Sequence, residues 1–133
     1  MRKIFFITFI CSVLTGVAQK KAIIILAHPS LQQSQTNKKL LQAINNDKNI
    51  VIHDLYALYP DEKIDIAKEQ QLIQQFDVIV FQFPLYWFSA PPLLHKWQDE
   101  VITSKFALSK NNPLQNKSLA IVTTVGGTQE DFT

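Results

Sequence analysis

The 133-residue sequence predicts one α/β domain organised as a doubly wound parallel sheet. Three apolar runs, residues 22–27, 78–83 and 118–124, are nearly continuous rather than alternating, which is typical of strands in a parallel sheet. Segments with helical spacing of apolar residues separate these runs. Hydrophobic residues make up 47% of the chain and charged residues 18%, so a single domain can bury a core.

Composition excludes several classes of function. The net charge of +2 comes from 13 basic and 11 acidic residues without a basic cluster, which argues against nucleic-acid binding. Cys11 is the only cysteine, so neither an intramolecular disulfide nor a cysteine-based zinc site is predicted. His28, His53 and His95 lack metal-ligand spacing, and no metal site is predicted. We interpret His53 as structural or exposed.

Residues 1–18 differ from the rest of the chain. Basic residues at positions 2 and 3 precede an apolar stretch, and small residues lead up to Gln19, which is the pattern of a secretory signal peptide cleaved after Ala18. The apolar stretch is too short to span a bilayer permanently. The alternatives are a true start further downstream or an apolar segment packed on the domain. The protein is therefore expected to be exported to the periplasm, or cytoplasmic if this segment is no signal.

The first strand is predicted at residues 22–27 because the run is β-branched and apolar. A polar loop follows, and Ser34 and Thr36 can cap the next helix. Asn37, Leu40, Leu41 and Ile44 share one face of that helix. Backbone N–H groups at such a helix start can bind a phosphate. Serine and threonine there are often only caps, so both interpretations stay open.

A second, shorter strand is predicted at residues 50–55 and ends in polar residues, as an edge strand can. Residues 56–63 are expected to form a loop. Asp65 is predicted to cap the next helix. The apolar face of that helix contains Ile66, Leu72, Ile73 and Phe76.

The third strand, residues 78–83, is expected to stop at Pro84, which cannot donate to a sheet ladder. Ser89 and Pro91 are predicted to open the following helix. Its apolar face contains Leu93, Leu94, Trp97 and Val101. Between strand and helix lies an aromatic loop at the sheet edge where α/β proteins bind ligands. The aromatic residues within the strand, Phe81 and Phe83, are assigned to the core.

The fourth strand, residues 118–124, is followed by Val125, Gly126 and Gly127. Two glycines permit close approach of the backbone to a ligand, although they can also form only a turn.

Four stretches together resemble one family in order and spacing. They are AHPSLQQSQTNK at residues 27–38, DLYALYPDEKIDIAKEQ at 54–70, FQFPLYWFSAPPLLHKWQDEV at 81–101, and TTVGGT at 123–128. They resemble the flavodoxin-like NAD(P)H:quinone oxidoreductases, including the small reductases that accompany bacterial potassium-efflux systems. The resemblance implies a flavodoxin-like domain over residues 20–133 with strand order two-one-three-four-five, and a bound FMN or FAD.

The resemblance also assigns a segment to each part of the flavin. Ser34, Thr36 and Asn37 would hold the phosphate, with His28 beside the phosphate and ribitol. The backbone of residues 84–88 would run along the ring system, and the glycines would approach its pyrimidine edge. The residues predicted to bind the cofactor are His28, Ser34, Thr36, Asn37, Pro84, Leu85, Tyr86, Trp87, Phe88, Thr123, Thr124, Gly126 and Gly127.

The activity that the resemblance implies is two-electron, ping-pong hydride transfer from NAD(P)H through the flavin to a quinone. No catalytic residue is predicted. A homodimer is expected because a second subunit completes the pocket in this family, and a membrane-associated partner is a further expectation.

The sequence departs from the pattern of this family in three places. Val125 replaces an extra glycine of some relatives, and Phe132 stands where several carry a tyrosine. The fold's fifth strand and last two helices have no counterpart, so we expect an incomplete domain or fragment with an uncovered sheet edge. The alternatives are therefore a truncated, inactive domain or a one-electron flavodoxin-type carrier. The carrier is disfavoured because the loop between His28 and Asn37 contains no glycine.

Overall fold

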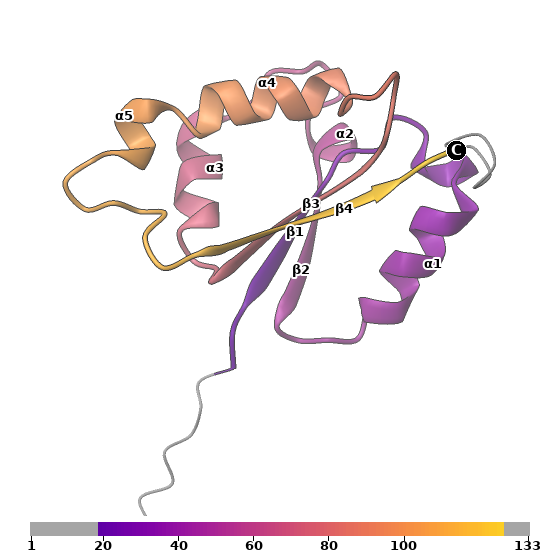
Figure 1. Ribbon diagram of the computed structural model, residues 1–133, viewed down its shortest axis with the longest axis horizontal. Helices are drawn as coiled ribbons and strands as arrows, with labels where there is room; N and C mark the ends of the chain where they lie inside the picture. The colour runs from indigo at the N-terminus through magenta and orange to yellow at the C-terminus, as the bar shows by residue number, and fades with distance from the viewer. Residues whose placement is uncertain (1–18, 127–133) are drawn as a thin grey trace, which may run out of the picture.

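A computed structural model describes residues 19–126, which form a four-stranded sheet. Helices cover both faces of this sheet (Figure 1). All strands are parallel, in the order β2-β1-β3-β4. This confirms the predicted strand order for the four strands, with β2 at an edge. The elements are β1 (Ala22–Leu26), η1 (Leu31–Gln33), α1 (Gln35–Ile44), β2 (Ile50–Asp54), α2 (Leu55–Leu58), α3 (Ile66–Ile73), β3 (Val78–Pro84), α4 (Pro92–Val101), α5 (Ser104–Ala107) and β4 (Ser118–Thr124).

The main core lies between the sheet and the layer formed by α3 and α4 (Figure 1). Trp97 of α4 is fully buried, and its ring meets Phe81 edge to face at a centroid distance of 6.0 Å. Phe83 is partly buried against the same cluster, so both predicted core phenylalanines are confirmed. The helix α1 covers the opposite face, where Ile24 is buried.

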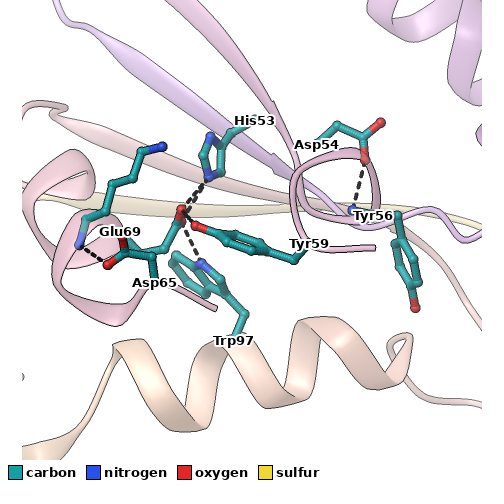
Figure 2. A network of polar contacts seen from close by, with 8 residues as sticks. His53, Asp54, Tyr56, Tyr59, Asp65, Glu69 and Trp97 are labelled. Atoms are coloured by element: carbon teal, nitrogen blue, oxygen red, sulfur yellow. Dashed lines mark hydrogen bonds and ion pairs between the residues drawn. The ribbon is translucent and has the colours of Figure 1, made fainter. Parts of the chain in front are cut away.

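A buried carboxylate connects β2, α3, α4 and the residue that follows α2 (Figure 2). Glu69 of α3 is fully buried and accepts hydrogen bonds from the Tyr59 hydroxyl at 2.5 Å and from Trp97 Nε1 at 2.8 Å. His53 Nε2 of β2 lies 2.9 Å from each of its oxygens. Burial raises the pKa of Glu69, but these hydrogen bonds outweigh burial and hold the pKa below its ordinary value. His53 therefore has a structural role, as predicted.

Several local predictions need correction. Residues 56–63 are not wholly a loop, because the short helix α2 begins at Leu55 after an Asp54 cap. Pro91, not Ser89, is the N-cap of α4. The short helix α5 has no counterpart in the sequence prediction. Asp65 caps α3 as predicted, through a 3.1 Å hydrogen bond from the Lys68 backbone N–H.

Among residues 19–126, no helix has the length and apolar composition needed to cross a bilayer. The predicted signal segment, residues 1–18, lies outside the described residues, as do Gly127 and Phe132.

Candidate functional site

A cleft of about 560 Å³ opens where the carboxyl ends of β1, β3 and β4 meet the start of α1. Parallel strands bring these ends to one edge of the sheet, which is where open α/β sheets bind ligands. Its size suits a small-molecule site. The lining residues are His28, Ser30, Gln33, Ser34, Gln35, Thr36, Pro84, Leu85, Tyr86, Thr124, Val125 and Gly126. None of these described residues is acidic, so an anion in the cleft meets no carboxylate on its walls.

The start of α1 supplies hydrogen-bond donors to the cleft. Ser34 is the N-cap, and its Oγ accepts the Asn37 backbone N–H at 3.2 Å. Thr36 lies inside the first turn and is no cap, which corrects the prediction that both residues cap the helix. The first N–H groups of a helix lack intrahelical acceptors and favour an anion. This end of the cleft is therefore suited to a phosphate.

Behind the cleft wall, Asn37 connects three elements. Its Nδ2 donates to Ser34 Oγ and to Thr124 Oγ1, both at 3.0 Å. Its Oδ1 accepts from Gln82 Nε2 of β3 at 3.0 Å. Asn37 is 1% exposed and does not line the cleft, so it supports the cleft wall from behind. The phosphate contact that the resemblance implies for Asn37 stays a prediction.

His28 follows β1 and is buried against the cleft wall. Its Nδ1 accepts the Ser30 backbone N–H at 3.1 Å. Burial lowers the pKa of His28, which favours the neutral ring. With Nδ1 occupied as an acceptor, the neutral ring carries its hydrogen on Nε2 and can donate there.

The loop after β3 forms a tight reverse turn. Tyr86 N–H donates to Ser89 O at 2.8 Å, and Ser89 N–H donates to Tyr86 O at 2.9 Å. Trp87 and Phe88 occupy the corners with φ of 49° and 61°, a left-handed conformation that is uncommon for aromatic residues. The turn presents them to solvent, with exposed fractions of 97% and 85%.

The structure brings eight of the predicted residues together around the cleft: His28, Ser34, Thr36, Pro84, Leu85, Tyr86, Thr124 and Gly126. Trp87, Phe88 and Thr123 do not line it, and Gly127 lies outside the described residues. Tyr86 is therefore the one aromatic side chain among the described residues that line the cleft. Direct flavin contact by each of these residues stays a prediction.

Sequence reasoning missed some contributors. Ser30 and Gln33 line the cleft from the loop before α1, and the polar composition of that loop was the only signal for them. Gln82 supports Asn37 from inside β3. The sequence indicated this role only by placing a polar residue, Gln82, within an otherwise apolar strand.

The chain belongs to the family described as having a flavodoxin-like fold, whose sequence profile matches residues 20–133. This agrees with the observed sheet order and confirms the predicted fold class.

Among its relatives, general stress protein 14 of Bacillus subtilis (strain 168) is 46% identical over 113 residues, which cover 84% of this chain and 65% of that protein. The glutathione-regulated potassium-efflux system ancillary protein KefG of Enterobacter sp. (strain 638) is 45% identical over 107 residues, which cover 80% of this chain and 58% of that protein. The chain thus spans about three fifths of the length of these relatives.

Solved structures show the same kinship. The general stress protein 14 of Treponema denticola, crystallised in complex with FMN, is 43% identical with a TM-score of 0.79; the match covers 85% of this chain and 66% of that one. An NADPH-quinone reductase from P. pentosaceus is 39% identical with a TM-score of 0.74, and the match covers 83% of this chain and 62% of that one.

Proposed function

We propose that the chain is a flavin-dependent NAD(P)H:quinone-type oxidoreductase, or the flavin-binding part of one, and that its flavin is FMN. The observation that carries the proposal is the cleft at the carboxyl ends of β1, β3 and β4. It combines a helix N-terminus, hydroxyl donors and a lining without acidic residues. The FMN complex of a relative 43% identical to this chain supports the choice of flavin.

The described residues fit such a group. Ser34, Thr36 and the first N–H groups of α1 would hold the phosphate, and His28 Nε2 would donate nearby. Residues 84–86 would run beside the ring system. A methyl group added at Gly126 would meet no atom of residues 19–126 within 4 Å, so these residues leave the space beside its backbone open to a ligand.

When bound, the flavin supplies the two-electron hydride chemistry, and the protein supplies binding and orientation. NAD(P)H and a quinone are proposed as donor and acceptor because relatives carry the names NAD(P)H oxidoreductase and NADPH-quinone reductase. The relative named as an ancillary protein of a potassium-efflux system makes a membrane-associated partner a further proposal.

We also propose that the chain acts as a homodimer. Trp87 and Phe88 are held out to solvent beside the cleft by a strained turn, so a second copy can cover them. Two copies arranged in this way would bring further aromatic side chains beside the cleft, which Tyr86 alone supplies among the described residues.

The test is NADPH oxidation by the 133-residue chain after reconstitution with FMN and gel filtration. We expect NADPH absorbance to fall only when a soluble quinone is added, and to stay constant for chain prepared without flavin. A chain that retains FMN but consumes no NADPH with any of several quinones would contradict the enzymatic proposal and favour an inactive flavin-binding domain.

A further inference from the structure

We infer that Gln82 is a positioning residue for the flavin phosphate. Through Asn37 it fixes the direction of a hydrogen-bond chain, so that the Ser34 hydroxyl points its hydrogen into the cleft. The inference rests on the proposed function, because the group that would receive this hydrogen is the phosphate of FMN.

The direction is set at the buried end of the chain. Gln82 is 3% exposed and Asn37 is 1% exposed, so neither amide exchanges freely with water. Gln82 Nε2 donates to Asn37 Oδ1 at 3.0 Å. An amide nitrogen can only donate and an amide oxygen can only accept. The Asn37 amide is therefore held with its oxygen toward β3 and its nitrogen toward the cleft.

The hydroxyl groups beside the cleft take their direction from that amide. Asn37 Nδ2 donates one hydrogen to Ser34 Oγ and the other to Thr124 Oγ1. Ser34 Oγ also accepts the Asn37 backbone N–H. Both acceptor positions of the Ser34 hydroxyl are then occupied, and its remaining capacity is to donate.

A phosphate monoester is the ligand that such an arrangement prefers. Its terminal oxygens are strong acceptors. A hydroxyl that can only donate suits them, whereas a hydroxyl that presents a lone pair repels them. Gln82 does not line the cleft, so it acts on the ligand through Asn37 and Ser34 rather than by contact.

The substitution Gln82→Glu reverses the chain while keeping the side-chain shape. An ionised carboxylate only accepts, so Asn37 must turn its nitrogen toward position 82 and its oxygen toward Ser34 and Thr124. The hydroxyls then donate to Asn37, and Ser34 presents a lone pair to the phosphate. We expect the ratio of FMN affinity to riboflavin affinity to fall at least about tenfold, because riboflavin lacks the phosphate.

The pH dependence separates positioning from general damage to the fold. Once protonated, the carboxyl group introduced by Gln82→Glu can donate to Asn37 Oδ1 and restore the native direction. Because position 82 is buried, the pKa of the introduced carboxyl should lie above that of a free glutamate. As the pH falls from about 8 to about 4.5, the affinity ratio of the variant should therefore recover toward that of the wild-type chain measured at the same pH. Gln82→Met, which has similar length and no titratable group, should show a smaller loss and no recovery.

The experiment is fluorescence titration of FMN and riboflavin with the full 133-residue chain and both variants, with circular dichroism to confirm folding. If Gln82→Glu is insoluble, Asn37→Asp replaces it. The carboxylate introduced by Asn37→Asp accepts hydrogen bonds from the Ser34 and Thr124 hydroxyls, so these hydroxyls point away from the cleft. The ratio of FMN affinity to riboflavin affinity should therefore also fall. An unchanged ratio, or no acid recovery in Gln82→Glu, would overturn the inference alone. A wild-type chain that binds FMN no better than riboflavin would overturn the phosphate site and with it the proposed function.

Discussion

Glu69 combines full burial with an ionised carboxylate because each of its oxygens receives donors from other elements (Figure 2). Such a group contributes to stability only while all its partners are present, since a buried charge or donor without a partner is costly. The pKa of Tyr59 is raised, mainly because the hydroxyl is buried and also because it donates a hydrogen bond to Glu69. The network lies away from the cleft, so its removal affects folding more directly than binding.

We expect Glu69→Gln to lower the free energy of unfolding by about 3 kcal/mol near pH 7, because the amide leaves at least one of the buried donors unpaired. Urea denaturation measures the difference. Glu100→Gln is the matched control. Glu100 is partly exposed, and its Oε1 lies 3.7 Å from Lys96 Nζ. Loss of this exposed ion pair should lower the free energy of unfolding by less than about 0.5 kcal/mol. Equal losses in the two variants would contradict the structural role of the network.

The pH dependence of that difference follows from the lowered pKa. A carboxyl whose pKa is lower in the folded than in the unfolded state stabilises the fold above the unfolded value and loses this contribution as the pH falls through the folded value. The difference between wild type and Glu69→Gln should therefore narrow as the pH falls below about 4.5. A difference that widens with acid would contradict the assignment of an ionised Glu69.

At the scale of elements, the turn after β3 stands out because two neighbouring residues within it adopt positive φ. Two adjacent aromatic residues adopt positive φ, a conformation that costs about 1 to 2 kcal/mol for each L-residue. Burial of apolar surface does little to offset this cost, since both side chains are exposed. Strain of this kind often marks a functional site.

Replacing Phe88 by glycine should raise the free energy of unfolding by about 0.5 to 1 kcal/mol, because glycine adopts positive φ without penalty. It should also weaken FMN binding if the aromatic loop covers the flavin. Thermal unfolding and FMN titration measure the two effects. Leu108→Gly is the control, since Leu108 is comparably exposed but has φ of −103°, and the change there should destabilise. A destabilised Phe88→Gly chain would show that the aromatic side chain, not strain, decides the turn.

The elements themselves were predictable to different degrees. The bounds of β4 match the prediction, because its apolar run is followed in the sequence by a pair of glycines. The helices α2 and α5 have four residues each, too few to show a helical repeat. The turn at Trp87 lacks the Asn-Gly or Asp-Gly pair that signals positive φ. Glu69 was missed because its partners His53 and Trp97 lie far from it in sequence.

At the scale of the whole molecule, the apolar core and the candidate binding site lie in different parts of the sheet. The helices α3 and α4 cover one face of the sheet (Figure 1), and this side holds the main apolar core and the Glu69 network (Figure 2). The carboxyl edge near α1 holds the cleft. The strand order places the ends of β1 and β3 beside each other, so residues far apart in sequence form one site. The strand order was predictable; the Asn37 network was not, because it depends on side-chain contacts across three elements.

The most direct test of this account is the dissociation constant of FMN for the 133-residue chain and for Ser34→Ala, measured by quenching of flavin fluorescence. We predict saturable binding and a loss of at least about tenfold in Ser34→Ala, since both a phosphate donor and the cap of α1 are removed. Asp65→Ala removes the cap of α3 at similar cost in stability and should bind FMN as the wild type does. No saturable binding, or equal weakening in the two variants, would contradict a phosphate site at the start of α1.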